Sequence, residues 1–473
     1  MIKSLAKLKA YNRHIRNRDF IHALALVPDK EWTTTSKRRW MCARLGIYKP
    51  LLEAGWNGRN TRSGVAYAQA LSAYGRVDEC QAILRQLNSK QNISRYLSEL
   101  IREFAKYNAH LSIQLIERTP EKKQIFYYHA LKYAYLSQTI NEDQSIETYH
   151  NTDDIQVFLE KNCAKNPDLF LLRSNLIQEP DQKLQLLNQY QSFFNLPQYQ
   201  LVNLQEPLSS LNLSLTKPVY HNPLSTLESN KHKVSILTTM FNAQQFIAST
   251  LHSLLNQSWS NLEVILIDDA STDDSLSIAE KIAKKDKRLK IVKQSANQGT
   301  YIAKTKGLEH ATGEFLICHD ADDWAHPLKI EHQVMPLLLD ACLQGTTSDW
   351  IKIDEHGNYF TRSLYPYIRK NPSSLMFRRR AIEKLNLDAK DQPLWQPVRT
   401  GADSELYERF KLVFGASTTY HVKKPLTIGA HHSSSLMNAD KTGTKNLSAR
   451  ISRLTYWEQW RREHIDMVRR GLL

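Results

Sequence analysis

Three carboxylates crowd one short segment, at Asp320, Asp322 and Asp323, shortly after the apolar run 315–318. Negative charges this close repel one another, and a divalent cation bound between their oxygen atoms relieves the repulsion. The alternative is a solvated turn, because Asp is also a favoured turn residue. The cluster alone leaves both interpretations open, so the neighbouring elements must decide between them.

Strands and helices alternate around this cluster from about residue 233 onward. Strands are predicted at 234–239, 263–267, 289–292 and 314–318, and helices at 244–257, 273–285 and 300–310. The alternation predicts an α/β fold, a mainly parallel Rossmann-like sheet with helices on both faces. Ligands of such sheets bind beyond the carboxyl ends of the strands. We therefore expect one crevice lined by three segments: Phe241-Asn242, Asp268-Asp269 and Asp320 to Asp322.

The first 200 residues follow a helical pattern, with apolar residues spaced by three and four. The pair 64–74 and 79–87, joined by a Gly-containing turn, resembles a tetratricopeptide-like hairpin, although no strict repeat recurs. We predict an irregular all-α array over 1–200, which would brace another domain or bind a protein partner. A Pro-containing connector is expected at 201–232, and an α/β domain at 233–445.

Length and charge limit the function classes. A chain of 473 residues should form two or three domains. Its net charge of +15 suits nucleic acid, an anionic membrane or phosphorylated small molecules. No dense Lys/Arg run or zinc-finger spacing favours nucleic acid, so we predict no nucleic-acid partner.

Five scattered cysteines with no C-x-x-C pair suit a reducing compartment. The basic N-terminus has no apolar stretch after it, as a secretory signal would. No segment approaches the roughly 20 apolar residues that a membrane span needs. A cytoplasmic location is therefore predicted.

The last segment, 446–473, mixes many Arg residues with apolar ones, including Leu454, Trp457, Trp460 and Ile465. This composition is typical of an amphipathic helix on an anionic membrane surface, which would place the protein peripherally on the inner face of the membrane. Docking of the helix on the rest of the protein is the alternative. The apolar positions form no single stripe, and both interpretations stay open.

Four segments, taken in order, resemble family 2 glycosyltransferases of the GT-A fold. Residues 239–242 are similar to the family's P-T-Y-N element, 267–273 to V-D-D-G-S-T-D, 297–307 to N-x-G and A-R-N-x-G, and 313–323 to G-E-Y-I-x-x-x-D-x-D-D. The resemblance extends over about 233–436. Phe241 stands where the family often has Tyr, and Lys304 where Arg is frequent.

The resemblance implies a nucleotide-sugar donor, a UDP-sugar, whose diphosphate is neutralised by a divalent metal acting as a Lewis acid. Asp322 is then the direct metal ligand, and Asp320 contacts the ribose or a metal-bound water. Asp323 would orient its neighbour or meet the sugar. Oxygen ligands suit manganese or magnesium.

The family pattern also implies the donor-binding residues. Asp269 would hydrogen-bond the nucleobase, with Thr239 and Phe241 forming the wall beside it. Lys304 would meet the diphosphate, unless it is an exposed helix lysine.

Segment 401–409 resembles the family's E-D-x-D-L-x-x-R stretch, which makes Asp403 the catalytic base that accepts the proton of the attacking hydroxyl. Ala402 replaces the usual preceding acid, and Glu405 is the alternative base. A later R-x-H-x-x-S-x-S-like segment implies that His432, rather than His431, completes the metal shell or touches the diphosphate.

The predicted function is an inverting, metal-dependent glycosyltransferase for a saccharide or lipid-linked acceptor, in capsule, lipopolysaccharide or other surface polysaccharide synthesis. One alternative is an inactive scaffold of the same fold whose helical part binds partners. Another is a nucleotidyltransferase, which would share the metal site.

Overall fold

The computed structural model describes residues 2–90, 93–120, 126–142, 152–215, 227–385, 393–439, 442–443 and 446–473. The chain forms two compact units. Unit 1 comprises 1–135, 362–365 and 434–473, and unit 2 comprises 136–361 and 366–433.

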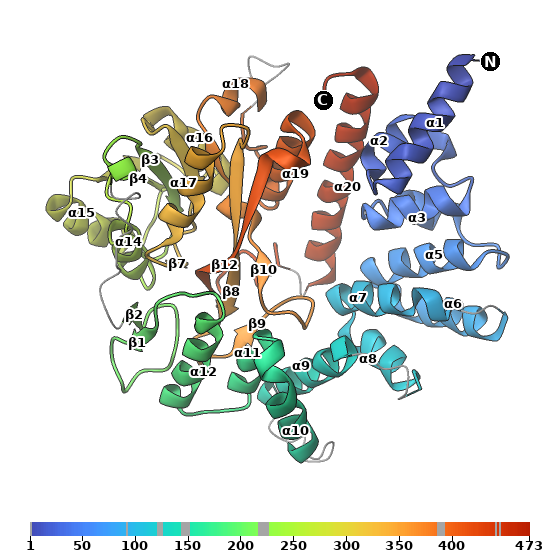
Figure 1. The fold of residues 1–473 in the computed structure, drawn as a ribbon, viewed down its shortest axis with the longest axis horizontal. Coiled ribbons are helices and arrows are strands. Elements are labelled where there is room, and N and C mark those ends of the chain that lie inside the picture. Colours follow the sequence, from blue (N-terminus) through green and yellow to red (C-terminus); the bar gives the residue numbers. More distant parts are fainter. Residues whose placement is uncertain are drawn as a thin grey trace. The chain divides into compact units, whose positions relative to one another are not determined.

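Unit 1 is built from helices, drawn in blue to cyan and in red in Figure 1. They are α1 (Ile2–Arg16), α2 (Phe20–Ala25), α3 (Ser36–Arg44), α4 (Lys49–Ala54), α5 (Thr61–Ala73), α6 (Val77–Lys90), α7 (Leu97–Tyr107), α8 (Ala109–Glu117), the first part of α9 (Phe126–Glu142) and α20 (Leu447–Arg470). Helices α5 and α6 pack together, as do α7 and α8, in the manner of helical hairpins. Side chains such as Leu24, Met41 and Ile47 form a buried core.

Helix α20 completes this core from the other end of the sequence. It packs beside α2, and its Leu454 and Ile465 are buried among the N-terminal helices. Glu458 of α20 accepts hydrogen bonds from the Tyr74 hydroxyl at 2.9 Å and from the Lys49 backbone N–H at 3.0 Å. The structure therefore favours docking for this helix, because protein already covers its apolar side chains. Within the described ranges, none of the helices is long and apolar enough to cross a bilayer.

Unit 2 contains a mixed sheet of ten strands in the described part of the chain. The main path runs β5-β4-β3-β6-β11-β8-β12-β7, with β9 and β10 paired to β8. Their bounds are β3 (Val234–Met240), β4 (Leu262–Asp268), β5 (Leu289–Lys293), β6 (Phe315–Cys318), β7 (Trp324–Ala325), β8 (Gly345–Ile353), β9 (Tyr359–Phe360), β10 (Arg369–Lys370), β11 (Met376–Arg378) and β12 (Thr419–Ala430). Strands β5, β4, β3 and β6 are parallel, as the sequence predicts, and the expected fold class is confirmed.

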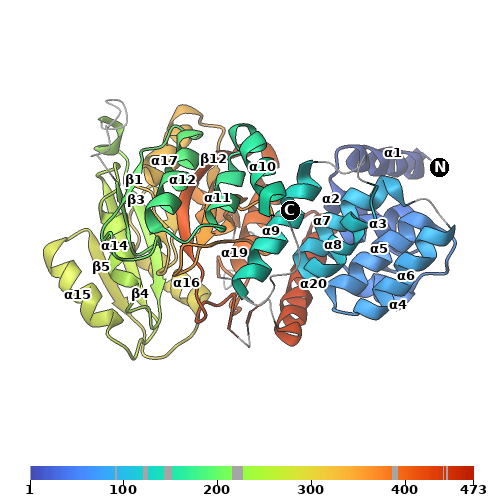
Figure 2. The same cartoon turned by 90° about the horizontal axis from the view of Figure 1, so that it is seen from below.

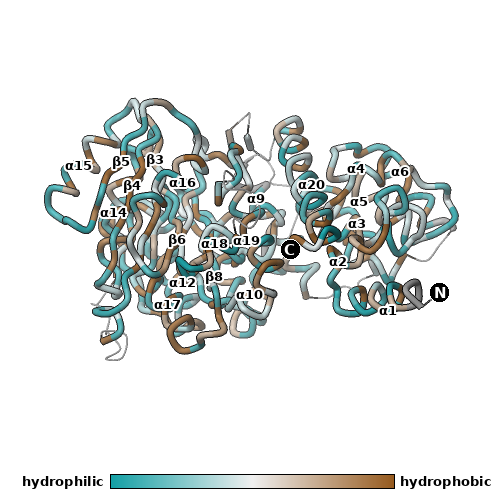
Figure 3. The backbone as a smooth tube through the Cα atoms, turned by 90° about the horizontal axis from the view of Figure 1, so that it is seen from above, coloured by the Kyte–Doolittle hydropathy of each residue, from teal (hydrophilic) through white to brown (hydrophobic). Residues whose placement is uncertain are grey.

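Helices cover both faces of the sheet because successive strand residues point to opposite sides. Ile236 packs into the cluster under α14 (Ile247–Leu255), α15 (Ser275–Lys285) and α17 (Lys329–Leu339). Its neighbour Leu237 packs into the cluster under α16 (Thr300–His310), α18 (Ala381–Leu385) and α19 (Ala402–Phe414). Figure 2 shows the α14 and α15 side and the α16 side of this sheet, and Figure 3 shows hydrophobic stretches along β3 and β4.

Residues 152–201, predicted as the end of the helical array, lie in unit 2 instead. They form α10 (Thr152–Asn162), α11 (Asp168–Ser174), α12 (Pro180–Ser192) and β1 (Tyr199–Leu201), which pairs with β2 (Leu213–Leu215) in the predicted connector. Side chains from α11 and α12 bind the backbone around β9 and β10. Asp168 accepts from the Ile368 N–H at 3.2 Å, and the Lys183 ammonium donates to the Gly357 carbonyl at 3.1 Å. Residues 216–226 of the predicted connector fall outside the described ranges.

Strand order brings a distant segment to the predicted crevice. Strand β11 is antiparallel to both β6 and β8, so β8 runs in the same direction as β6. Strand β12 is parallel to β8 and therefore also to β6. The carboxyl ends of β3, β4, β6 and β12 consequently lie at one edge of the sheet.

Candidate active site

The loops after β3 and β4 are tied to each other at this edge. The Asn242 side-chain oxygen accepts from the Thr272 backbone N–H at 2.8 Å, and the Asn242 N–H donates to Ser271 Oγ at 3.1 Å. Asn242 and Ala270 both adopt the left-handed backbone region, with φ of 49° and 62°. This region is costly for a residue with a Cβ atom and is tolerated where the surroundings fix the chain. The turn that follows β4 is therefore held in one shape.

Asp269 lies in the same turn and holds a third loop. Its carboxylate accepts three hydrogen bonds, from Gln294 Nε2 at 2.8 Å, from the Gln298 N–H at 2.8 Å and from the Gly299 N–H at 2.7 Å. Gly299 has a φ of 97° and caps α16. Asp269 is only 2% exposed. The residue predicted to meet the nucleobase thus also fixes the start of α16.

Thr239 and Phe241 flank this turn. Thr239 Oγ1 lies 2.6 Å from Thr300 Oγ1, which links the end of β3 to the start of α16. Phe241 is 47% exposed, an unusual state for a large apolar ring. A partly exposed ring beside Asp269's loop leaves a surface against which a planar base can stack.

The acidic cluster after β6 separates into groups with different surroundings. Asp322 and His432 come together: Asp322 Oδ2 lies 3.0 Å from His432 Nε2, and the His432 ring stacks on Phe246 at 4.5 Å between centroids. Asp320 remains partly exposed, with 36% of its side-chain surface accessible. Asp323 turns inward to β12, where it accepts from the Ala430 N–H at 3.1 Å and is 3% exposed.

These surroundings shift the carboxyl pKa values in opposite directions. Burial, reinforced by the charges of Asp322 and Asp320, raises the pKa of Asp323 well above its usual range. Burial also acts to raise the pKa of Asp322, but the hydrogen bond with His432 and the charge of Lys352 outweigh it, and the pKa of Asp322 is lowered. The hydrogen bond with His432 and the charge of Lys352 thus favour the ionised form of Asp322.

Asp403, in the first turn of α19, is the second important carboxylate of the site. The Lys304 ammonium lies 3.0 Å from both of its oxygen atoms, and the Ser373 hydroxyl donates to Oδ2 at 3.0 Å. The same ammonium lies 3.8 Å from Asp320 Oδ1. The side chain of Asp403 keeps 14% of its surface exposed, whereas that of Lys304 keeps 1%. The buried Lys304 ammonium therefore lies close to both Asp403 and Asp320.

Lys304 was expected either to meet the diphosphate or to be an exposed helix lysine. Its side chain is only 1% exposed, so the second alternative is wrong, and the diphosphate contact stays a prediction. Burial alone would lower the pKa of Lys304, but the charges of Asp403 and Asp320 outweigh burial and raise the pKa well above the usual value. The ammonium stays charged because it is paired. The contact between Lys304 and Asp403 is one that the sequence did not predict.

Two alternatives raised by the sequence are removed by geometry. Glu405 is 2% exposed and forms a two-pronged ion pair with Arg409, at 2.8 and 3.1 Å, inside unit 2. A carboxylate held this way cannot reach a substrate hydroxyl. His431 stacks on Phe360 at 3.9 Å between centroids, and it is its neighbour His432 that reaches Asp322.

Sequence patterns gave no role to three residues that shape the site. Ser373 precedes β11 and reaches Asp403 because an antiparallel strand starts at the edge where parallel strands end. The Tyr301 hydroxyl accepts from the Gly401 N–H at 3.0 Å and so positions the start of α19. Lys352 of β8 lowers the pKa of Asp322. No local pattern marks Lys352.

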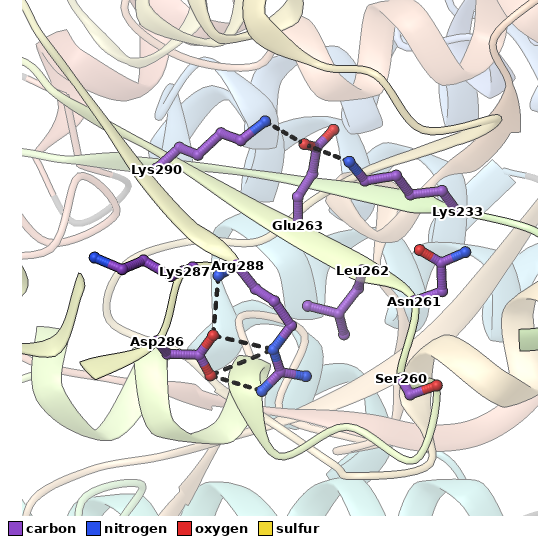
Figure 4. Close-up of a pocket in the computed structure, with 9 residues that line it drawn as sticks. All are labelled: Lys233, Ser260, Asn261, Leu262, Glu263, Asp286, Lys287, Arg288 and Lys290. Atoms are coloured by element: carbon purple, nitrogen blue, oxygen red, sulfur yellow. Dashed lines mark hydrogen bonds and ion pairs between the residues drawn. The ribbon is translucent and has the colours of Figure 1, made fainter. Parts of the chain in front are cut away.

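A cavity of about 380 Å³ lies at the other edge of the sheet, lined by residues that include Lys233, Leu262 and Lys290. Figure 4 shows Lys233 and Lys290 meeting Glu263 from opposite sides, at 2.9 and 2.8 Å. These residues lie at the start of β3, β4 and β5. The cavity is therefore separate from the candidate site at the carboxyl ends.

The residues at the carboxyl edge fit a divalent cation. Two ligands at right angles and about 2.1 Å from an octahedral ion lie about 3 Å apart, and Asp322 Oδ2 and His432 Nε2 are separated by 3.0 Å. Asp320 is a further, partly exposed carboxylate of this segment, but its oxygen atoms do not lie within 4.8 Å of both other ligand atoms. Carboxylate ligands with room for water suit magnesium or manganese.

Comparison with known proteins gives a family model and several relatives that each match part of the chain. Residues 235–392 match the family model described as Glycosyl transferase family 2. EpsH of Bacillus subtilis (strain 168), named as a glycosyltransferase, is 44% identical over 94 residues, which are 20% of this chain and 27% of EpsH. TuaG of the same organism, named as a teichuronic acid biosynthesis glycosyltransferase, is 36% identical over 112 residues, 24% of this chain and 44% of TuaG. The matched regions thus cover less than half of each relative.

Among solved structures, S. aureus TarS 1–349 in complex with UDP-GlcNAc is similar to this chain with a TM-score of 0.36 and 16% identity. The match covers 50% of this chain and 72% of the TarS chain.

Proposed function

This chain contains a family 2 glycosyltransferase domain of the GT-A fold, and on that premise we propose an inverting, metal-dependent transfer of a sugar from a UDP-sugar to an acceptor hydroxyl group. One observation carries the proposal. Asp403 and the acidic cluster at 320–323 lie at one edge of the sheet, joined by the Lys304 ammonium at 3.0 Å from Asp403 and 3.8 Å from Asp320. The edge thus combines a proton acceptor with a cation-binding group.

Asp403 is the proposed base, and its hydrogen bonds indicate which atom acts. A carboxylate offers about four lone-pair positions. Among the described residues, Lys304 contacts both oxygens and Ser373 contacts Oδ2, so a lone pair on Oδ1 remains for the acceptor hydroxyl. As that hydroxyl oxygen attacks the anomeric carbon, its proton passes to Asp403. Lys304 and Ser373 fix the orientation of the carboxylate.

Asp322 and His432 would hold the metal, and Asp320 would bind the ribose or a metal-bound water. When bound, a divalent ion acts as a Lewis acid that stabilises the negative charge on the leaving diphosphate. Asp322 remains ionised at this edge, as a ligand requires. Asp323, buried against Ala430, supports the loop from inside rather than meeting the sugar.

Asp269, Thr239 and Phe241 would form the nucleoside site. Three hydrogen bonds from described residues occupy the Asp269 carboxylate, two on Oδ1 and one on Oδ2, which leaves Oδ2 a lone pair for a nucleobase N–H. Phe241 would stack on the base. The acceptor is proposed to be a saccharide or lipid-linked saccharide of surface polysaccharide synthesis, supported by the teichuronic acid biosynthesis named for TuaG.

Paired substitutions test the roles of the two carboxylates. Asp403→Asn should lower transfer at least a hundredfold while donor binding is retained, because base catalysis contributes about 10²–10⁴ in rate.

Asp322→Ala should remove the dependence of turnover on Mn²⁺ or Mg²⁺ together with most of the activity. The measurements are release of UDP from a panel of UDP-sugars and calorimetric donor binding.

Glu408→Gln is the matched control, since Glu408 lies on the same helix as Asp403 and pairs with Lys411 instead. It should keep full activity. Normal turnover in Asp403→Asn would remove the base assignment. Donor binding by the wild type without transfer to any saccharide would favour the inactive scaffold, and release of pyrophosphate from a nucleoside triphosphate would favour a nucleotidyltransferase.

A further inference from the structure

Three metal-ligand side chains meet in unit 1, on the first two helices. His14 lies in the last turns of α1, Asp19 caps α2, and His22 is in the first turn of α2. Asp19 Oδ2 lies 2.9 Å from His14 Nδ1, and Asp19 Oδ1 lies 2.9 Å from His22 Nδ1. The two imidazole rings stack with centroids 5.2 Å apart and planes 12° from parallel.

Helix capping alone does not account for this arrangement. A cap requires a side-chain oxygen that accepts a backbone N–H, and Asp19 Oδ1 already accepts from the His22 N–H at 3.4 Å. Capping does not need the two imidazole contacts. Each imidazole directs its Nδ1 atom to a different oxygen of the Asp19 carboxylate. One ligand atom from each of the three residues lies within 4.8 Å of the others, so small rotations bring all three onto one ion.

The ligand set indicates which ion would bind. Two imidazole nitrogens and one carboxylate form a three-ligand zinc set that leaves a further position for water. The site beside Asp322 is richer in oxygen and suits harder ions. His14 also lies at the carboxyl end of α1, where the partial negative charge of the helix favours a cation. This offsets the positive charges of Arg13 and Arg16 in the same turn.

We propose that His14, Asp19 and His22 bind one zinc ion that fastens α1 to α2. In the metal-free arrangement the imidazoles of His14 and His22 face Asp19 with Nδ1, and the tautomer with its proton on Nδ1 donates that N–H to the carboxylate. When zinc binds, the proton leaves Nδ1 for solvent and Nε2 takes up a proton from solvent. The lone pair of Nδ1 then coordinates the zinc ion. Between 21% and 35% of each side chain is exposed, so solvent and ion reach the cluster directly.

Zinc titration of the chelator-treated full chain tests the site. Wild type should bind one zinc equivalent that His14→Gln and His22→Gln each lose, since Gln can still donate to Asp19 but is a poor zinc ligand. His110→Gln is the matched control, because His110 is an exposed histidine of unit 1 that bonds to Gln114 at 2.9 Å. The His110→Gln variant should still bind one equivalent of zinc. With Co²⁺ in place of zinc, the visible d–d bands should disappear in the first two variants and persist in the control.

An unchanged zinc stoichiometry and cobalt spectrum in His14→Gln and His22→Gln would show an adventitious ion only and would overturn the proposal. Asp322→Ala should keep this zinc equivalent while losing metal-dependent turnover. Zinc stoichiometry therefore tests the zinc site, and turnover separately tests the proposed sugar transfer.

Discussion

At the residue scale, the main feature is a lysine buried between two carboxylates. Lys304 has 1% side-chain exposure, and its ammonium contacts both oxygens of Asp403. Burying a charge is costly unless it is paired, and removing one partner leaves the other uncompensated. Lys304 is therefore a positioning residue for Asp403, and its effect on the reaction can be separated from its effect on stability.

Replacing Lys304 by Met should lower the unfolding free energy of unit 2 by about 3 kcal/mol, because Asp403 loses its counter-charge. Transfer should fall more than donor affinity, since Lys304 contacts Asp403, the proposed base. The double variant Lys304→Met/Asp403→Asn should recover part of the stability, which urea unfolding measures. Lys306→Met is the control on the same helix, where Lys306 is 54% exposed and pairs with Glu309. Equal destabilisation by Lys304→Met and Lys306→Met would contradict the pairing argument.

At the element scale, helices α11 and α12 brace the loops around β9 and β10. Asp168, at the start of α11, accepts from the backbone of Ile368 and Tyr367 while 4% exposed. Burial is the largest influence on this carboxyl and raises its pKa to about 7, although the two backbone bonds act to lower it. This brace should therefore respond to pH in the neutral range.

Stability of unit 2 should fall as pH rises from 5 to 8. The folded pKa of Asp168 lies above its unfolded value near 3.9, so the folded state binds the extra proton between these values and loses that advantage as pH passes 7. The loss accumulates at about 1.4 kcal/mol per pH unit up to the folded pKa, which gives roughly 2 to 3 kcal/mol between pH 5 and 7. In Asp168→Asn this part of the pH dependence should be absent in urea unfolding. Asp181→Asn, an exposed position at the start of α12, should behave as wild type. Parallel pH profiles for wild type and Asp168→Asn would contradict the assignment.

Local sequence patterns predicted the elements of the parallel half of the sheet closely. The predicted strand 263–267 appears as Leu262–Asp268 and the predicted helix 300–310 as Thr300–His310. These elements have local periodicity and end in recognisable polar turns. The burial of Lys304 could not be predicted in this way, because it depends on the approach of Asp403, 99 residues away.

The same limit explains the domain boundaries. Helices α10 to α12 have the same local pattern as the helices before them, so the sequence grouped them with the array. Their assignment to unit 2 depends on long-range bonds such as the one between Asn175 and the Tyr359 carbonyl at 2.9 Å. Periodicity shows that a helix has an apolar face, but not which distant segment will cover it.

At the scale of the whole molecule, the chain leaves unit 1 and returns to it. Unit 1 contains both the first 135 residues and residues 434–473, and the core includes Leu454 and Ile465 of α20. The two units have separate cores, since α20 packs into one and the sheet into the other. A defect in α20 should therefore destabilise unit 1 selectively.

Leu454→Ala should lower the unfolding free energy of unit 1 by about 2 to 5 kcal/mol, the usual cost of removing a buried Leu side chain. Calorimetry should show one thermal transition shifted down and the other unchanged. Affinity for a UDP-sugar should stay at the wild-type value. Ser452→Ala, at an exposed position on the same helix, should change stability by less than about 0.5 kcal/mol. A single transition that shifts as a whole would contradict independent unfolding of the units.

The place of α20 in unit 1 also constrains the order of events during synthesis on the ribosome. Residues up to 135 emerge long before Leu454, with all of unit 2 translated in between. At 5–20 residues per second, the N-terminal helices wait roughly 15 to 65 s for their last partner. Throughout that interval the apolar surface that α20 will cover is open to chaperones and to other nascent chains. Unit 2, whose segments are complete by residue 433, can finish folding before the helical unit that began first.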